Sequence, residues 1–254
     1  MRRLSIKNPP IMDFYGKESI NTISSNLLFA GKEIKKIAFT SCVAGEGKST
    51  MSLRVAINMA GRGKKTLLLD MDLRRSRLMQ NAGIQAEDGQ KVVGVAHYLA
   101  GHCSLDEVVY ETDIENFYCI PIGRDVVNPL TMIDSVEFEE LLEKMKEQFD
   151  LIIIDTPPIG LVVDAAEIAK HCNGIALVVE YGKRHKSELV NAVTQLKRSG
   201  CPILGCVIDK VIVKSLSEKQ YYRSHYYYSN GKYGNYGSYG YGDTHPKEKG
   251  NESD

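Results

Sequence analysis

Residues 40–50 read Thr40-Ser41-Cys42-Val43-Ala44-Gly45-Glu46-Gly47-Lys48-Ser49-Thr50, and this stretch decides the fold. An apolar run, Lys36–Ser41, leads into it, and a helix-compatible stretch, Thr50–Ala60, follows. A glycine-rich turn that ends in Gly-Lys-Ser between a strand and a helix is typical of a phosphate-binding P-loop. The alternative is a glycine-rich turn that meets Gly-Lys-Ser by chance, but the strand and the helix on either side favour the P-loop.

The chemistry of a P-loop assigns a role to each part of this motif. Gly45 and Gly47 let backbone N–H groups curl around phosphate, and the start of the helix adds its positive dipole end. We expect Lys48 to be exposed at this anion site and to reach the β- and γ-phosphates, and the Ser49 hydroxyl to bind Mg²⁺. Cys42 stands where the motif usually has its first glycine. The predicted nucleotide-binding residues of the loop are Ala44, Gly45, Glu46, Gly47, Lys48, Ser49 and Thr50.

Two further apolar runs end in carboxylates. Asp70 and Asp72 follow Leu67-Leu68-Leu69, and Asp155 ends Leu151-Ile152-Ile153-Ile154 ahead of Thr-Pro-Pro. Ligands of open parallel sheets bind at the carboxyl ends of strands, so these carboxylates should face the nucleotide. The alternatives are an acidic turn that caps a loop and a buried strand before a Pro-Pro turn. We predict that the catalytic residues are Lys48, Asp70, Asp72 and Asp155, and that the Mg²⁺ ligands are Ser49, Asp70 and Asp155.

The order of apolar runs and helical patterns indicates the fold class. Several runs are apolar without alternation, as in strands buried on both faces of a parallel sheet. The pattern predicts an α/β, three-layer P-loop fold with a mainly parallel central sheet over residues 17–212. Residues 1–16 should form an extended N-terminal arm. The six predicted strands are Lys36–Ser41, Thr66–Asp70, Phe117–Pro121, Leu151–Asp155, Gly174–Glu180 and Ile203–Asp209.

Residues 213–254 differ from the rest in composition. Nine of the 14 tyrosines stand here among Gly, Ser and Asn. Such a segment cannot bury a core, so we predict a flexible tail whose tyrosines accept phosphate. A tail without a function is the alternative. The predicted phosphoacceptors are Tyr221, Tyr222, Tyr226, Tyr227, Tyr228, Tyr233, Tyr236, Tyr239 and Tyr241.

Composition narrows the possible partners. Lys plus Arg and Asp plus Glu both number 32, so no net field attracts nucleic acid or an anionic membrane. The six cysteines form no C-x-x-C pair, and we expect reduced thiols. The absence of a long apolar stretch predicts a soluble, cytoplasmic protein that reaches the membrane only through a partner.

Taken together, these motifs resemble the bacterial tyrosine kinases of capsule and exopolysaccharide synthesis, in the stand-alone form of Gram-positive bacteria. The order is S-x-x-A-G-E-G-K-S-T, L-L-L-D-x-D-x-R-R, I-I-I-D-T-P-P and a tyrosine cluster, and the resemblance covers about residues 15–241. It implies ATP and Mg²⁺ as cofactors, autophosphorylation of the tail in trans, and Asp72 as the acceptor of the tyrosine proton. It also implies a transmembrane activator, a phosphotyrosine phosphatase and a homo-oligomer as partners.

Two positions depart from the pattern of this family. The family carries E-x-x-R-x-x-R for ring assembly, whereas Asn21 and Ser24 stand at the two arginine positions here. The asparagine that reads adenine in the family is replaced by Asp209, which can still accept a hydrogen bond from the adenine amino group.

Two other classes of protein compete with a kinase. A positioning ATPase of the ParA or MinD type has a similar fold, but it usually has a second lysine early in the P-loop, where Val43 and Ala44 stand here. A single-strand nucleic-acid binder would join aromatic side chains to dense positive charge. Between Tyr221 and Tyr241 the basic residues are Arg223 and Lys232 alone, which argues against that class.

Overall fold

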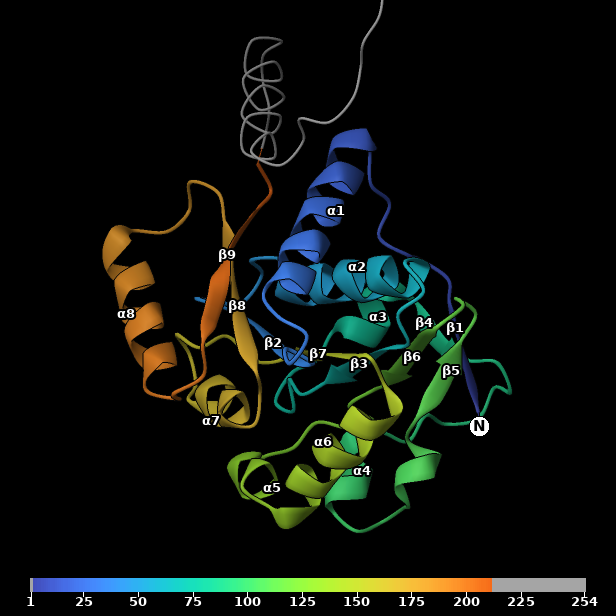
Figure 1. Cartoon of the computed structure of the whole chain (residues 1–254). Helices are drawn as coiled ribbons and strands as arrows, with labels where there is room; N and C mark the ends of the chain where they lie inside the picture. Colours follow the sequence, from blue (N-terminus) through green and yellow to red (C-terminus); the bar gives the residue numbers. More distant parts are fainter. Residues whose placement is uncertain (1, 212–254) are drawn as a thin grey trace, which may run out of the picture. The chain divides into compact units, whose positions relative to one another are not determined.

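A nine-stranded sheet runs through the centre of the described chain (Figure 1). The computed structural model describes residues 2–211, so the predicted acceptor tyrosines lie outside the described residues. The strand order is β4-β1-β5-β6-β3-β7-β2-β8-β9. The strands are β1 (Arg3–Ile6), β2 (Lys36–Ser41), β3 (Thr66–Asp70), β4 (Ile84–Ala86), β5 (Tyr110–Thr112), β6 (Phe117–Ile120), β7 (Leu151–Asp155), β8 (Gly174–Glu180) and β9 (Ile203–Asp209).

The six strands predicted from apolar runs form one parallel array. They pair in the order β6, β3, β7, β2, β8 and β9. The antiparallel pairs, β5 with β6 and β1 with β4, lie beyond this array. The mainly parallel sheet confirms the predicted fold class. Because all six carboxyl ends lie at one edge of the sheet, β2, β3, β7 and β9 deliver their ends to the same region.

Helices cover both faces of the sheet and complete the three predicted layers (Figure 1). Leu68 of β3 packs in the core cluster that includes Met51 and Val55 of α2. Its neighbours Leu67 and Leu69 point the other way, into the cluster of α6. One face carries α1 (Phe14–Phe29), α2 (Lys48–Gly61) and α3 (Leu78–Ala82), and the other carries α4 (Val95–Leu99), α5 (Leu130–Ile133), α6 (Val136–Gln148), α7 (Asp164–Lys170) and α8 (Lys186–Lys197), with a short 3₁₀ turn at Leu105–Glu107.

The N-terminal segment differs from the extended arm that we predicted for residues 1–16. Arg3–Ile6 form β1, which pairs with β4 and β5 and therefore belongs to the sheet. Leu4 is fully buried, and α1 already begins at Phe14. Arg3–Ile6 alternates polar and apolar residues and is not an apolar run of the kind from which the other strands were predicted.

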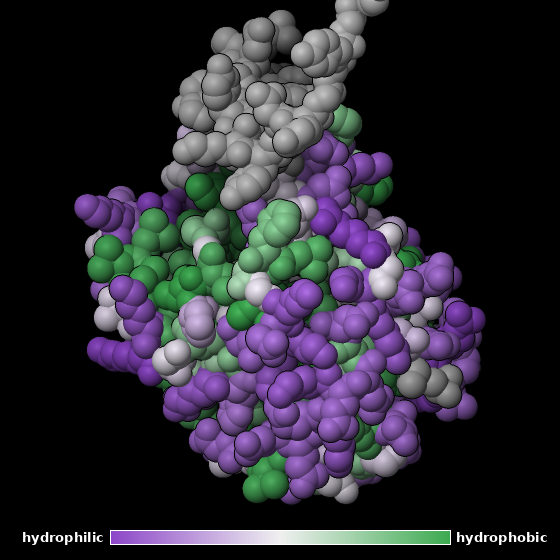
Figure 2. All heavy atoms as spheres, in the orientation of Figure 1, coloured by the Kyte–Doolittle hydropathy of each residue, from purple (hydrophilic) through white to green (hydrophobic). Residues whose placement is uncertain are grey.

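The surface in Figure 2 is largely polar, with apolar residues gathered near the edge formed by β8 and β9. Ile208 of β9 is 58% exposed. Among residues 2–211, none of the helices has the length and apolar character needed to cross a membrane.

Candidate active site

The predicted P-loop connects β2 to α2. Its glycines adopt backbone conformations that few other residues reach, with φ values of 85° at Gly45 and 93° at Gly47. Gly47 also has no room for a side chain, because an added Cβ would lie 2.0 Å from an Asp209 carboxylate oxygen. The loop tip at Ala44 and Gly45 is exposed, and α2 begins at Lys48.

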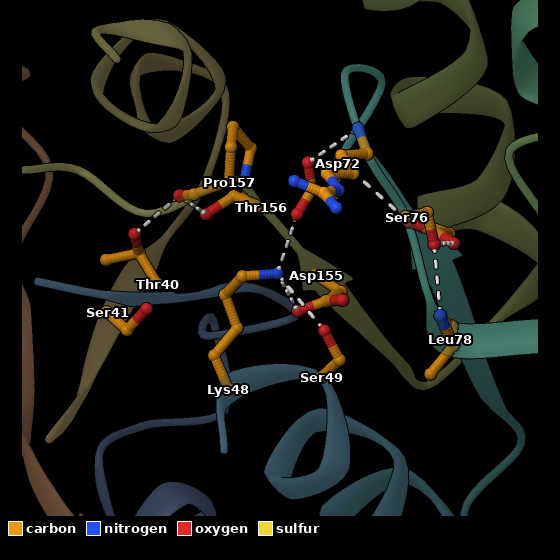
Figure 3. Close-up of polar contacts among 12 residues, drawn as sticks. Thr40, Ser41, Lys48, Ser49, Asp72, Ser76, Leu78, Asp155, Thr156 and Pro157 are labelled. Carbon is orange, nitrogen blue, oxygen red and sulfur yellow. Dashed lines mark hydrogen bonds and ion pairs between the residues drawn. The ribbon is translucent and has the colours of Figure 1, made fainter. Parts of the chain in front are cut away.

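The structure brings the four predicted catalytic side chains together. Asp70 and Asp155 are register partners at the ends of β3 and β7. Lys48 Nζ lies 3.1 Å from Asp72 Oδ2 and 3.2 Å from Asp155 Oδ1 (Figure 3). It also donates to Ser49 Oγ at 3.1 Å. Residues from three separate parts of the chain therefore surround one ammonium group.

The prediction that Lys48 is exposed was wrong. Lys48 is 7% exposed, because its side chain points inward and forms ion pairs with Asp72 and Asp155. Coulomb attraction is strong at a buried position, and the ammonium finds no comparable partner at the loop surface. The predicted contact between Lys48 and phosphate would therefore require the side chain to leave Asp72 or Asp155.

Asp70 lies deepest in the cluster. Its Oδ1 accepts from the backbone N–H of Asp72 at 3.2 Å, and its Oδ2 accepts from Ser76 Oγ. Burial raises the pKa of Asp70 above its usual range, and the charge of Asp155 raises it further. The pKa of Asp155 is also raised by burial, although Lys48 opposes this shift. Sequence analysis missed Ser76, because nothing in its local pattern points to Asp70.

Two of the three residues predicted to hold Mg²⁺, Ser49 and Asp155, lie around the ammonium of Lys48 together with Asp72. The third, Asp70, forms no ion pair with Lys48, and both of its carboxylate oxygens accept hydrogen bonds from Asp72 and Ser76. The second carboxylate oxygen of Asp155 is buried and has no hydrogen-bond partner among the described residues. Carboxylate and hydroxyl oxygens are hard ligands of the kind that Mg²⁺ selects, and substrate phosphates usually supply the remainder of its shell.

Glu46 points away from the space where phosphate would lie. It is 1% exposed, and its Oε2 accepts from the backbone N–H of Val43 at 2.9 Å. Its Oε1 lies 3.1 Å from Arg184 Nε. Arg184 lies in the run Lys183-Arg184-His185-Lys186 at the start of α8, and it pairs there with the buried carboxylate of Glu46. The side chain of Glu46 thus holds the loop in shape, and its backbone is the part that remains for phosphate.

The end of β9 contacts the P-loop from the side opposite the carboxylates. The Asp209 carboxylate lies against Gly47, and Lys210 Nζ donates to the carbonyl of Gly45 at 2.6 Å. Lys210 also donates to Glu180 Oε2 at 2.8 Å and has a positive φ of 57°. Asp209 was predicted from the sequence. Lys210 was not, because it belongs to no recognised motif.

Arg74 forms a two-point ion pair with Asp164. Its Nε lies 2.6 Å from Asp164 Oδ2, and its second guanidinium nitrogen lies 3.0 Å from Oδ1. Asp164 is 1% exposed at the start of α7. The loop after β3 is therefore fastened to the segment after β7, which sets the position of Asp72 relative to Asp155.

Comparison with known proteins identifies relatives of this arrangement. Residues 34–200 match the AAA domain family. The tyrosine-protein kinase CpsD of Streptococcus agalactiae is 38% identical over 224 residues, which cover 88% of this chain and 90% of CpsD. The kinase domain of the Escherichia coli tyrosine kinase ETK superposes with a TM-score of 0.70 at 27% identity and covers 79% of each chain. The septum site-determining protein MinD of Pyrococcus horikoshii, solved with Mg-ADP, has a TM-score of 0.56 at 24% identity, covers 73% of this chain and 76% of MinD, and shares the fold. The chain belongs to the family of bacterial tyrosine kinases that includes CpsD.

Proposed function

We propose that this protein is an ATP- and Mg²⁺-dependent protein-tyrosine kinase of capsular or exopolysaccharide synthesis. The observation that carries the proposal is the cluster of Lys48, Ser49, Asp72 and Asp155 at the P-loop. The similarity to CpsD over 88% of the chain favours a kinase over a positioning ATPase. ATP would supply the phosphoryl group, and Mg²⁺ bound by Ser49, Asp155 and Asp70 would offset phosphate charge.

Residues of the chain assist the phosphoryl transfer, accept the tyrosine proton and bind the adenine. The tyrosine oxygen forms a bond to the γ-phosphorus, the bond from that phosphorus to ADP breaks, and the phenol proton passes to a carboxylate. Asp72 suits this last step, because it is 8% exposed whereas Asp70 and Asp155 are fully buried. Lys48, once released from the carboxylates, donates to the transferring phosphate and stabilises its charge. The adenine amino group would donate to Asp209.

The acceptors in this proposal are the nine tyrosines from Tyr221 to Tyr241, phosphorylated in trans by another copy. A membrane-bound activator would gather copies at the membrane, and a phosphotyrosine phosphatase would reverse the modification. High local concentration within such a cluster favours the transfer between chains.

Mass spectrometry of the intact chain after incubation with ATP and Mg²⁺ tests the proposal. We expect phosphotyrosine between residues 221 and 241, and a chain truncated before Tyr221 should still bind ATP while losing most of the signal. Hydrolysis of ATP without any phosphotyrosine, with or without an activator, would instead support a positioning ATPase.

Asp72→Asn tests the assigned proton acceptor. Asn keeps the shape of the side chain but cannot take the proton, so single-turnover transfer should fall more than ATP affinity. A collapse of ATP affinity with normal transfer would make Asp72 an organiser of Mg²⁺ instead.

A further inference from the structure

A cavity of about 260 Å³ lies beside the P-loop helix, between α2, α3 and the N-terminal segment. Leu53 and Leu78 supply apolar wall, and Asn8 and Asn81 supply amide groups. Ser49 lines one part of it, so the cavity adjoins the cluster around Lys48. Figure 3 shows Ser49 and Leu78 on the same side of the carboxylates. Ligand pockets usually start at about 300 Å³, so this volume suits one side chain better than a nucleotide.

Arg54 gives the cavity its charge. Arg54 lines the cavity, and its Nε is buried without a hydrogen-bond partner among residues 2–211. Within the same residues, no carboxylate forms an ion pair with it. A buried N–H group without an acceptor is costly, so this site is suited to a ligand that brings an oxygen atom.

The cavity also lies on the opposite side of β2 from Asp209, the residue predicted to bind the adenine base. Strand β3, which leads into α3, lies on one side of β2, and β9 with Asp209 lies on the other. If the base of a nucleotide lies near Asp209, its γ-phosphate would lie on the other side of β2, where Asp72 and the cavity are. The acceptor must approach that phosphate from the side away from ADP.

We propose that this cavity receives the side chain of the acceptor tyrosine. The apolar wall packs against the ring, and Arg54 donates hydrogen bonds to the phenol oxygen before transfer and to the phosphate afterwards. Guanidinium–phosphate hydrogen bonds are among the strong ones, and a guanidinium also stacks favourably on an aromatic ring. This inference rests on the proposed kinase activity and names the binding site of its second substrate.

The test compares Arg54→Met with Arg62→Met in the intact chain. Met keeps the unbranched apolar part of the side chain and removes the guanidinium. Arg62 follows the last residue of α2 and contacts Asn21 and Ser25 away from the cavity. Phenyl phosphate is the probe, titrated with saturating ADP and Mg²⁺ so that the P-loop is occupied. We expect Arg54→Met to weaken binding of phenyl phosphate about tenfold, as for the loss of one charged hydrogen bond, and Arg54→Lys to restore part of it.

Kinetics with an added tyrosine peptide and with the chain's own tail distinguish the sources of the acceptor. Arg54→Met should raise the KM for the peptide about tenfold and slow tail phosphorylation, with an unchanged KM for ATP. Unchanged phenyl phosphate binding, a loss of ATP affinity instead, or equal binding of inorganic phosphate would each overturn the proposal. Wild-type chain that binds phenyl phosphate but forms no phosphotyrosine would overturn the kinase activity, and with it the role of the cavity as an acceptor site.

Discussion

At the scale of single residues, Lys48 has two roles: it pairs with the carboxylates in this structure, and it contacts phosphate in the proposed reaction. Its ammonium occupies the centre of a carboxylate cluster that would otherwise carry uncompensated negative charge. In the proposed reaction, nucleotide with Mg²⁺ would bring another cation to the carboxylates and an anion to the lysine. The side chain that pairs with Asp72 and Asp155 would then stabilise the transferred phosphate.

Lys48→Met should therefore have two effects. Phosphotyrosine formation should fall by about 10²–10³, as for the loss of one preorganised donor. The melting temperature without nucleotide should also fall, by about 2–4 °C for each kcal/mol lost, because Asp72 and Asp155 lose their partner. Thermal melting with and without MgCl₂ checks this, and Mg²⁺ should stabilise the variant more than the wild type.

Lys64→Met is the control for this substitution, since Lys64 is exposed beyond the end of α2. It should leave both quantities unchanged. Normal phosphorylation by a well-folded Lys48→Met chain would refute the P-loop assignment, and an unchanged melting temperature would show that the ion pairs contribute nothing.

At the scale of elements, the end of β9 fixes the shape of the P-loop. Lys210 joins the Gly45 carbonyl to Glu180 of β8. Loss of this bond should let the loop sample other shapes and so weaken its grip on phosphate. We expect Lys210→Met to raise the KM for ATP several-fold, by the roughly 1 kcal/mol that one hydrogen bond contributes, with little change in kcat.

Lys210→Arg should rescue most of that affinity, because it can still donate to the carbonyl. Lys183→Met is the matched control, since Lys183 is exposed on the same side of the sheet. Equal KM values for ATP in all three variants and the wild type would show that Lys210 does not contribute to nucleotide binding.

At the end of β2 that is far from the P-loop, an ion pair joins Lys36 to Glu143 of α6. Lys36 is 7% exposed, and its Nζ lies 2.6 Å from Glu143 Oε1. The hydrogen bond from Lys36 holds the pKa of Glu143 below its ordinary value, with help from Lys146. A lowered pKa means that the stabilisation is present above the unfolded pKa and is lost as pH falls through the folded pKa.

Glu143→Gln should therefore lower the free energy of unfolding at pH 7, by about 1 kcal/mol because Glu143 is half exposed and screened. The deficit relative to wild type should shrink as the pH falls below about 4. Urea unfolding at both pH values measures this, with Glu147→Gln on the same helix as the control. A deficit that grows toward low pH would contradict the assigned sign.

At the scale of the whole molecule, the apolar strands were predictable and the contacts that adjust the site were not. Runs such as Leu151–Asp155 reveal their burial through composition alone, and the P-loop motif marks Lys48 and Ser49. Arg184 and Lys210 act through contacts with loop residues more than 100 positions away, which no local pattern encodes. The strand β1 was missed because its partners, not its own sequence, define it as a strand.

Assembly is also a property of the whole chain, and the positions that lack the family's arginines face inward. Asn58 of α2 donates to Asn21 Oδ1 at 2.9 Å, and Ser24 is fully buried. Asn21 thus joins α1 to α2, and Ser24 is not accessible to a neighbouring copy. We expect a monomer or weak association at micromolar concentration, with low basal activity, and an arginine at Ser24 should disturb the packing of α1.

Sedimentation combined with phosphorylation time courses at several protein concentrations checks this expectation. The rate per chain should rise with concentration, because transfer occurs between copies. A stable ring at low concentration would show that other contacts replace the arginines, and a rate independent of concentration in a monomer would refute transfer in trans.

The position of β2 in the sheet has a consequence for how each new chain is made. This strand carries the P-loop and is synthesised early, but both of its neighbours, β7 and β8, come more than 100 residues later. The ribosome adds about 5–20 residues per second, so the P-loop waits several seconds without the strands that complete it. Asp155 follows Lys48 by more than 100 residues, and Lys210 is made after it, shortly ahead of Tyr221. A nascent chain can therefore complete its nucleotide site only after β9 has been made, and the tyrosines from Tyr221 to Tyr241 are synthesised after every residue of that site.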